Sequence, residues 1–198
     1  MTGPRRRRSS RSPVVDLDRV DLNVLAIRAR DGDRDAEAAF IGRTMRDVWR
    51  FCAHVLDVRR ADDAVQATYL RALRSLRNYR GDAAAKTWLI GVARNVCLDE
   101  MRSDSRQQRL ITRLRAEPHH PVTGLDTHAP ELVEALDTLS TDRKEAFVLT
   151  QLLGFTYEET AVIAGCPIGT VRSRAARARA DLFVHLQDDS VATRSAAT

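Results

Sequence analysis

Arginines and small residues are interspersed along the segment from residue 168 to residue 186, and this mixture suits contact with DNA. Wound as a helix, at about 100° per residue, the segment turns one apolar set to a single side: Val171, Ala175, Ala178, Leu182 and Leu186. Its other sides present small residues and arginines: Gly169, Thr170, Arg172, Ser173, Arg174, Arg177 and Arg179. A slim face admits the helix backbone to base edges in the major groove, while guanidinium groups bind guanine or phosphate. We therefore predict a DNA-reading helix, with a solvated basic helix in a bundle as the alternative.

The residues just before this segment predict the frame that holds it. Thr156 and Glu159 have the spacing of a capping box, which starts a short helix. Gly165, followed by Cys-Pro, then ends that helix, and a second helix begins near Ile168. A short helix, a turn containing glycine and a longer second helix together form a helix-turn-helix.

A helix predicted in the first half of the chain carries a second mixed surface. Leu89, Val92 and Val96 share one face, which we expect to pack inward. A different arc combines cations, an amide and apolar contact: Gly91, Arg94, Asn95, Leu98 and Arg102. Trp88 lies beside this arc, and unstacked bases bind aromatic platforms as well as charge. The alternative is that Trp88 belongs to the core and Arg94 is solvated, which leaves only a basic helical domain.

The residue pattern gives little support for disulfide formation, metal binding or catalysis. The three cysteines, Cys52, Cys97 and Cys166, lie far apart and form neither a disulfide framework nor a zinc motif, so we expect reduced, mostly buried thiols. The carboxylate pairs at 62–63 and 99–100 are adjacent residues that diverge on a helix, so we expect caps or solvated faces rather than metal ligands. No phosphate-binding loop or catalytic motif is visible. We expect no metal, no cofactor and no enzymatic activity.

Composition is that of a water-soluble globular protein. The 198 residues are 43% hydrophobic and 30% charged, with a net charge of +5. No apolar run approaches the roughly 20 residues of a membrane span, so we expect no membrane association and a cytoplasmic, nucleoid-associated protein. Residues 20–115 carry 19 basic against 13 acidic side chains, whereas residues 116–139 carry five acidic and no basic ones. The basic half favours a polyanionic partner, and the acidic stretch has the character of a linker.

The elements that position these surfaces are predicted to be helices, and the fold class to be all-α. Apolar residues recur at helical spacing through residues 20–106, which we expect to form a four-helix domain. In the first helix the spacing favours Val20, Val24 and Ile27 as the buried side, and the acidic pair at 62–63 is expected to open the third helix. The second and third helices are expected to bury two stripes: Phe40, Thr44, Val48, Phe51 and Val55, then Val65, Thr68, Tyr69, Ala72 and Leu76.

The remaining segments divide the chain further. Residues 131–186 are predicted to form a second small helical domain, which contains the helix-turn-helix. Between the two domains, residues 107–130 include prolines and acidic residues without an apolar stripe, so we expect a flexible linker. Residues 1–19, a basic arm, and residues 187–198 are expected to be disordered.

Both domains resemble a known family. The run Asp-Asp-Ala-Val-Gln-Ala-Thr-Tyr-Leu-Arg-Ala from Asp62, with Tyr79-Arg80-Gly81, Thr87-Trp88-Leu89 and Ala93-Arg94-Asn95, is similar in order and spacing to conserved region two of extracytoplasmic-function (ECF, group IV) sigma factors of the sigma-70 family. Residues 157–161 and 165–174 resemble region four of the same proteins. The resemblance spans residues 21 to about 186, in two independent blocks.

The resemblance implies an alternative sigma factor that binds core RNA polymerase and directs promoter-specific initiation. Its third helix would dock on the clamp helices of the large catalytic subunit, with five candidate residues: Asp62, Asp63, Gln66, Leu70 and Arg74. The family usually has glutamate after that glutamine, and this chain has Ala67, which removes one acidic contact. The minus-ten element would be captured as a single strand by Arg80, Lys86, Trp88, Arg94, Asn95 and Arg102.

The resemblance also implies further contacts. Region four would read the minus-thirty-five element as duplex and contact the flap of the other large subunit, while the acidic linker would thread toward the cleft of the polymerase. An anti-sigma factor is a possible partner. The residues leave two alternatives of other classes: a stand-alone helix-turn-helix regulator that binds operators as a dimer, and a recombinase-like enzyme, for which no nucleophile is evident.

Overall fold

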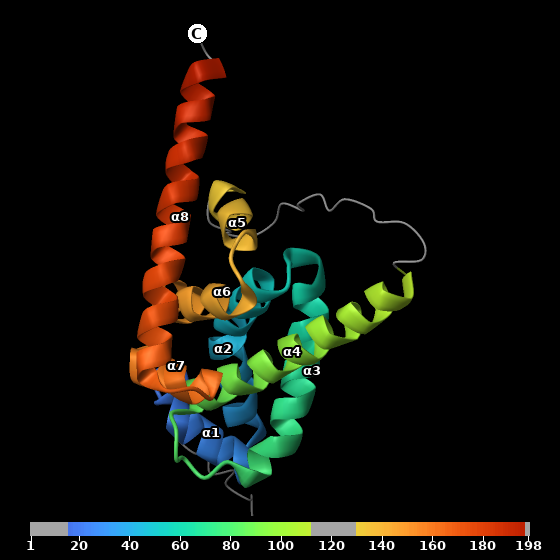
Figure 1. The fold of residues 1–198 in the computed structure, drawn as a ribbon. Helices are drawn as coiled ribbons and strands as arrows, with labels where there is room; N and C mark the ends of the chain where they lie inside the picture. Colours follow the sequence, from blue (N-terminus) through green and yellow to red (C-terminus); the bar gives the residue numbers. More distant parts are fainter. Residues whose placement is uncertain (1–15, 112–129, 197–198) are drawn as a thin grey trace, which may run out of the picture.

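The computed structural model describes residues 16–111 and 130–196, and every regular element within these ranges is helical (Figure 1). The first domain comprises α1 (Leu22–Arg30), α2 (Arg34–Val55), α3 (Val58–Ser75), a 3-10 turn η1 (Leu76–Asn78) and α4 (Ala85–Ile111). The second comprises α5 (Pro130–Asp137), α6 (Thr141–Phe147), a π-helical turn η2 (Val148–Leu152), α7 (Tyr157–Ala164) and α8 (Ile168–Ala196). The predicted all-α class is confirmed.

The two central stripes of the first domain pack as predicted. All ten residues of the stripes on α2 and α3, including Leu76 in η1, are buried and belong to one apolar cluster or lie within it. The hydroxyl of Tyr69 lies 2.8 Å from that of Thr44, so the polar atoms of both buried side chains are satisfied. These helices show a clear period because each has one inward face.

The buried face of α1 differs from the expected one. Leu25, Ala26 and Ala29 are buried, whereas Val24 and Ile27 are 46% and 38% exposed. Leucine and alanines at positions 22, 25, 26 and 29 also follow helical spacing, so two stripes compete in this short sequence. The stripe containing the alanines is the one that packs, which corrects the prediction.

The start of α3 is also corrected. Asp57 caps this helix, because its carboxylate accepts a hydrogen bond of 3.1 Å from the amide of Arg60. The acidic pair Asp62 and Asp63 lies one turn inside the helix, and both residues are exposed. An aspartate is a better N-cap than an interior residue, and Asp57 offers that cap earlier in the chain.

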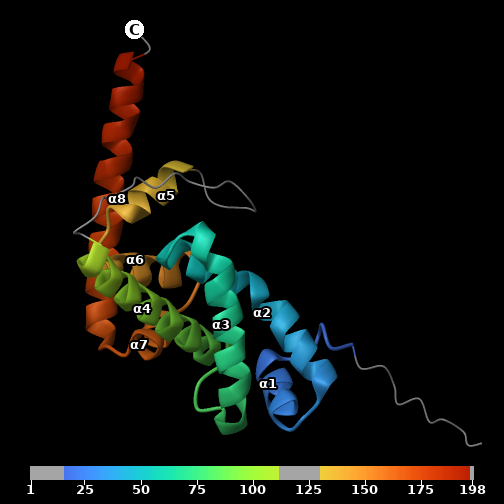
Figure 2. The same ribbon diagram turned by 90° about the vertical axis from the view of Figure 1, so that its right-hand side faces the viewer.

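The two domains pack against each other. Helix α7 packs on α4, and α6 and η2 pack on α2 (Figures 1 and 2). Five side chains of the second domain join the apolar cluster of the first: Val148, Leu149, Leu153, Phe155 and Ile163. A smaller cluster, formed by Ala135, Leu136, Leu139, Ala178 and Leu182, ties α5 to α8.

The ends of the domains fall partly outside the described residues. Of the expected linker, residues 107–111 continue α4 and Pro130 begins α5, while 112–129 are not described, nor are residues 1–15 of the basic arm. Helix α8 extends past α5 to Ala196 (Figure 1), where a disordered tail was expected from residue 187. No glycine after Gly169 and no proline interrupts the helix, so nothing in the backbone ends it earlier.

Candidate nucleic-acid and polymerase interfaces

The helix-turn-helix is built by local hydrogen bonds. The Thr156 hydroxyl accepts from the Glu159 amide at 3.1 Å, and the Glu159 carboxylate accepts from the Thr156 amide at 2.9 Å, which confirms the capping box. Gly165 ends α7 with φ of 62° and ψ of 37°, a left-handed conformation that favours glycine. Helix α8 then begins at Ile168, as predicted.

Helix α8 buries the predicted side. Val171, Ala175, Ala178 and Leu182 are buried, and the side chain of Leu186 lies outside the described residues. Six of the seven candidate DNA contacts occupy the rest of the helix: Gly169, Arg172, Ser173, Arg177 and Arg179, which are exposed, and Thr170, which is half-buried.

Two arginines of α8 are held by neighbours in the same domain. The Arg172 guanidinium lies 5.7 Å from the centroid of the Tyr157 ring, at a distance suited to a cation–π contact. Arg174 donates to the Asp142 carboxylate and lies 3.7 Å from the Cys166 sulfur. Arg172 is therefore placed at the start of the exposed face, and Arg174 is engaged with α6.

The loop between η1 and α4 is fixed by bonds to α1. The Asn23 side-chain oxygen accepts from the Ala85 amide at 2.7 Å, and Arg30 donates to the Tyr79 carbonyl at 3.2 Å. The Tyr79 hydroxyl donates to the Ala83 carbonyl at 2.8 Å, closing the loop on itself. Neither Asn23 nor Arg30 was predicted, because their role comes from packing between distant segments.

The candidate residues for the minus-ten strand fall into two groups. Arg80, Asn95 and Arg102 are exposed, on the loop and on α4. Trp88 is half-buried against the core, 5.2 Å from Tyr79 between ring centroids. Lys86 and Arg94 are partly buried and face the second domain.

Lys86 and Arg94 each contact a residue of the segment from α6 to α7. Arg94 donates to the Glu145 carboxylate, and Lys86 lies 5.2 Å from the Phe155 ring centroid and 2.6 Å from Asp47. Burial raises the pKa of Glu145, while the Arg94 guanidinium acts in the opposite direction. These contacts engage two of the six candidate strand-binding residues, while Arg80, Asn95 and Arg102 are exposed.

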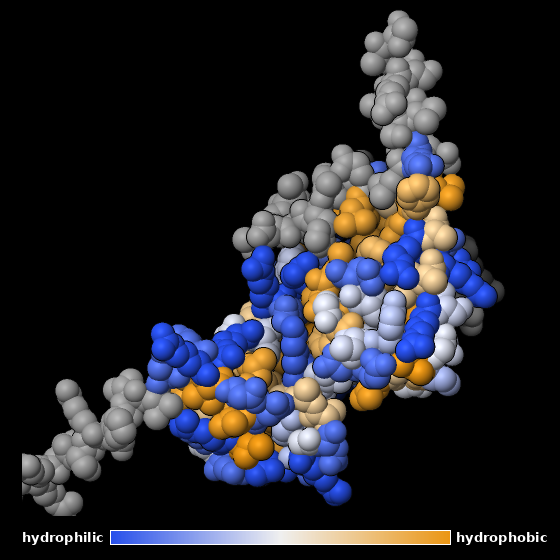
Figure 3. Space-filling view, turned by 90° about the vertical axis from the view of Figure 1, so that its left-hand side faces the viewer, coloured by the Kyte–Doolittle hydropathy of each residue, from blue (hydrophilic) through white to orange (hydrophobic). Residues whose placement is uncertain are grey.

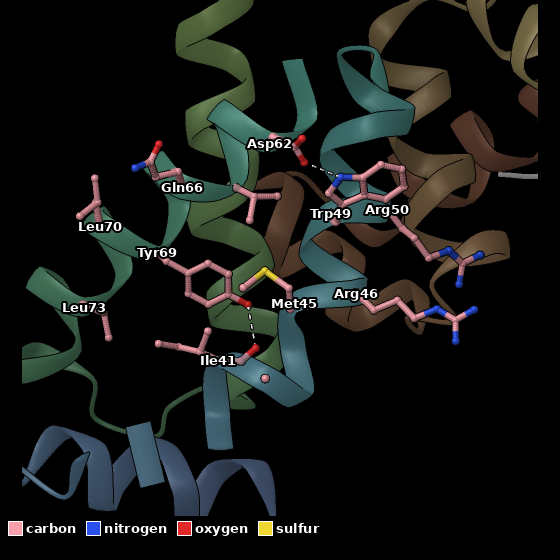
Figure 4. A pocket seen from close by; sticks show the side chains of 12 residues that line it. Ile41, Met45, Arg46, Trp49, Arg50, Asp62, Gln66, Tyr69, Leu70 and Leu73 are labelled. Atoms are coloured by element: carbon pink, nitrogen blue, oxygen red, sulfur yellow. Dashed lines mark hydrogen bonds between the residues drawn. The ribbon is translucent and has the colours of Figure 1, made fainter. Parts of the chain in front are cut away.

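The five candidate docking residues form one exposed strip. Asp62, Asp63, Gln66, Leu70 and Arg74 are all exposed on α3. Beside them lies a groove of about 820 Å³ between α2 and α3, here called the docking groove (Figure 4). Its lining is largely apolar and includes Ile41, Met45, Trp49, Val65, Tyr69, Leu70 and Leu73.

Polar contacts shape the rim of the docking groove. The Trp49 indole donates to the Asp62 carboxylate at 2.9 Å, and the Tyr69 hydroxyl donates to the Ile41 carbonyl at 3.4 Å. Leu70 is 54% exposed, and in Figure 4 it lies at the edge of the groove. The α2 wall was missed from the sequence, although Ile41, Met45 and Trp49 recur at intervals of four beside the buried stripe.

The acidic pair at 99–100, weighed above as possible metal ligands, has a structural role. Asp99 and Glu100 pair with Arg71 and Arg60, each at 2.8 Å, and so connect α4 to α3. Cys52 and Cys97, far apart in the sequence, are both buried with their sulfur atoms 3.8 Å apart, and Cys166 is partly buried. Within residues 16–111 and 130–196 there is no group of three or more histidine, cysteine or acidic side chains arranged to hold a metal ion. Over the same ranges, no helix is both long and apolar enough to cross a membrane.

Comparison with known proteins identifies the family. Residues 40–107 match "Sigma-70 region 2" and residues 130–182 match "Sigma-70, region 4". The chain is 42% identical over 176 residues to the ECF RNA polymerase sigma factor SigC of Mycobacterium tuberculosis, covering 86% of this chain and 94% of that protein. The chain belongs to the ECF sigma factors.

Further similarities agree with this family. The ECF sigma factor EcfG of Rhodopseudomonas palustris is 36% identical over 132 residues, with 66% of this chain and 73% of that protein covered. The structure of the sigma factor RpoE in complex with the anti-sigma factor NepR from Bartonella quintana superposes with a TM-score of 0.66 at 29% identity, covering 74% of this chain and 94% of that one.

Membership in the family establishes the broad function. The protein is an alternative sigma factor, which binds core RNA polymerase and directs promoter-specific transcription initiation. Two matched regions in the order of the family, rather than a helix-turn-helix alone, argue against a stand-alone operator-binding regulator. Sigma factors are not enzymes as a family, so the recombinase alternative has no support.

Proposed function

We propose that this sigma factor docks on the clamp helices of the large catalytic subunit of RNA polymerase through the docking groove. The observation that carries the proposal is an exposed apolar groove flanked by the charged strip of α3. A monomeric protein rarely leaves a continuous apolar surface open unless a partner covers it. Leu70 and Met45 supply apolar contact from opposite walls, while Asp62 and Arg74 supply charge at the edge.

Helix α4 and the loop before it are proposed to capture the minus-ten strand. Arg80, Asn95 and Arg102 offer exposed donors along this surface, with Lys86, Trp88 and Arg94 beside them. Extruding a base from the duplex costs a few kcal/mol, which cation contacts to the backbone and an aromatic surface would offset. The side chain of Trp88 is half-buried, so only part of it is open to a base.

Helix α8 is proposed to read the minus-thirty-five element in the major groove. Gly169, Thr170 and Ser173 keep the helix slim, and Arg177 is placed to meet a base edge. Arg172 and Arg179 are proposed phosphate contacts. Arg174 reaches a phosphate only if its contact with Asp142 is exchanged.

The proposal extends to the arrangement of the chain and to further partners. Residues 20–106 and 131–186 are the two functional regions, joined by a linker at 107–130. For the flap of the other large subunit, the candidates are Phe183 and Val184, which are both exposed on α8. Figure 3 shows apolar surface near the upper end of the coloured part of the molecule. An anti-sigma factor is a proposed regulator, by similarity to the RpoE complex.

Substitution of Leu70 tests the docking proposal. Leu70→Ala removes an exposed apolar contact without opening a cavity in the core. An interface anchor of this kind contributes about 1–2 kcal/mol, so core polymerase should bind about 5–30-fold more weakly. The measurement is a binding titration of labelled sigma factor with core enzyme. Val162→Ala, which alters another exposed apolar residue, on α7, is the matched control and should bind normally. Equal binding by both variants would contradict the proposed site.

A further inference from the structure

The loop between η1 and α4, residues 79–84 and here called the strand loop, leads directly into the proposed strand contacts. Arg80 lies on the loop itself, and Lys86 and Trp88 lie in the first turn of α4. Tyr79 is the one buried side chain of the loop, while its other residues are exposed or half-buried. A segment with so few buried contacts of its own depends on bonds from neighbouring elements for a fixed conformation.

The helix that follows the strand loop has no local side-chain cap at its first residue. Ala84 occupies the N-cap position, because its carbonyl accepts the first helical bond from the Trp88 amide at 2.9 Å. An N-cap residue normally offers a side-chain oxygen to the free amides of the first turn, and alanine has none. The Asn23 side chain of α1 supplies that oxygen and accepts from the Ala85 amide at 2.7 Å. The cap therefore comes from a residue 62 positions earlier in the chain.

The beginning of the strand loop is tied to α1 as well. Arg30 donates to the Tyr79 carbonyl at 3.2 Å, and the Tyr79 hydroxyl donates to the Ala83 carbonyl at 2.8 Å. The Tyr79 ring lies 5.2 Å from the Trp88 ring, between centroids. Helix α1 thus holds both ends of the loop, through Arg30 at its start and Asn23 just after its end.

We propose that α1 sets the conformation of the strand loop, and that Asn23 is a positioning residue for capture of the minus-ten strand. The inference rests on the proposed function, because that function assigns Arg80 and Trp88 to the strand. Contacts that are held in place before binding lose less conformational freedom when the strand arrives. Asn23 acts through the Ala85 amide, to which its side-chain oxygen is bonded.

Asn23 is a cleaner probe of this role than Arg30. Arg30 is a cation, so its removal also weakens the general attraction for DNA. Asn23 is uncharged, and Asn23→Ala removes only the acceptor for the Ala85 amide. A loop that spends less time in the competent conformation captures the strand in proportion to that fraction. We expect promoter opening to slow by about 2–12-fold, the equivalent of one hydrogen bond.

The first experiment measures hydrogen exchange of the Ala85 amide in the full chain by nuclear magnetic resonance. Asn23→Ala should speed this exchange by about 2–12-fold. Asn23→Asp keeps a side-chain oxygen as acceptor and should protect the amide as the parent chain does. Arg28→Gln is the matched control, because it removes a polar contact of the same helix, the pair with Asp33 at 2.6 Å. It should leave the exchange unchanged, and equal exchange in all four chains would overturn the proposal.

The second experiment measures promoter opening by core polymerase loaded with each full-length variant. The probe is a duplex promoter fragment taken from a genomic start site that the parent protein selects, with a fluorophore beside the start site. Asn23→Ala should slow the opening step, while its affinity for core polymerase and for the closed duplex stays at the parent value. Asn23→Asp should restore the rate. A purely structural defect would lower all three quantities together.

Arg80→Ala, measured beside these variants, separates the inference from the function on which it rests. If Arg80→Ala opens the promoter slowly and Asn23→Ala opens it like the parent, the positioning role of Asn23 is overturned and the proposed function stands. If Arg80→Ala also opens it like the parent, the assignment of the strand loop to the minus-ten strand is contradicted, and the inference falls with it.

Discussion

At the scale of single residues, Arg172 and Arg177 have different surroundings on the exposed part of α8. Arg172 is held over the Tyr157 ring at the beginning of the helix, a position suited to phosphate. Arg177 is exposed one turn beyond Ser173, among the small residues of the slim face. The first is expected to add affinity and the second to add sequence discrimination.

Two alanine substitutions test this division. Arg177→Ala should lose about 1–3 kcal/mol at one base pair of the upstream element and relax specificity there. Arg172→Ala should weaken binding evenly across sequences and reduce the slope of affinity against salt by about one unit. Binding to a panel of singly mutated upstream elements, at several salt concentrations, measures both effects. Indistinguishable profiles would show that the assigned helix face is wrong.

The buried hydroxyl of Tyr69 makes the stability of the fold depend on pH in the alkaline range. Burial raises the pKa of Tyr69 from 10.0 to about 12, against the opposing effect of its bond to Thr44. The unfolded chain therefore loses this proton near pH 10 while the folded chain keeps it, so the free energy of unfolding falls as the pH rises from 10 to about 12.

Tyr69→Phe keeps the ring and removes the titrating group. Between pH 9 and pH 11 the parent chain should lose more thermal stability than the variant, because only the parent chain carries the titrating Tyr69 hydroxyl. At neutral pH the variant should be less stable by about 0.5–1.5 kcal/mol, because the bond to Thr44 is lost. Melting curves at neutral pH, at pH 9 and at pH 11 measure both effects. Equal losses for the two chains would mean that folding does not raise the pKa of Tyr69.

At the scale of elements, the orientation of α8 depends on how α7 begins and ends. The capping box starts α7 and Gly165 turns the chain toward α8. Thr156→Ala removes the acceptor for the Glu159 amide and should cost about 1 kcal/mol of stability. Thr156→Ser keeps the hydroxyl and should cost much less. Urea unfolding of the three chains decides the point, and equal stability of all three would show that the cap contributes nothing.

Helices that bury a single face could be predicted from the spacing of their apolar residues. Features that depend on packing between distant segments could not. The stripes of α2 and α3 and the inward side of α8 follow from local periodicity alone. In α1, two apolar stripes compete, and only packing against the neighbouring helices chooses Leu25, Ala26 and Ala29. The α2 wall of the docking groove, Ile41, Met45 and Trp49, was not predicted, because it becomes a groove only where α3 packs beside α2.

At the scale of the whole molecule, the two domains are placed so that one covers part of the other. Arg94 and Glu145 are 51 positions apart in the sequence, so no local pattern pairs them. The docking groove and the exposed face of α8 lie outside this contact.

Run-off transcription from a fragmented genomic library, using core RNA polymerase with and without this protein, tests the central claim most directly. We expect transcripts that start only when the protein is present, from sites that share two motifs at a fixed spacing. Leu70→Ala should use these start sites less, because its docking on core polymerase is expected to be weaker. No new start sites, together with no binding to core polymerase, would contradict the account.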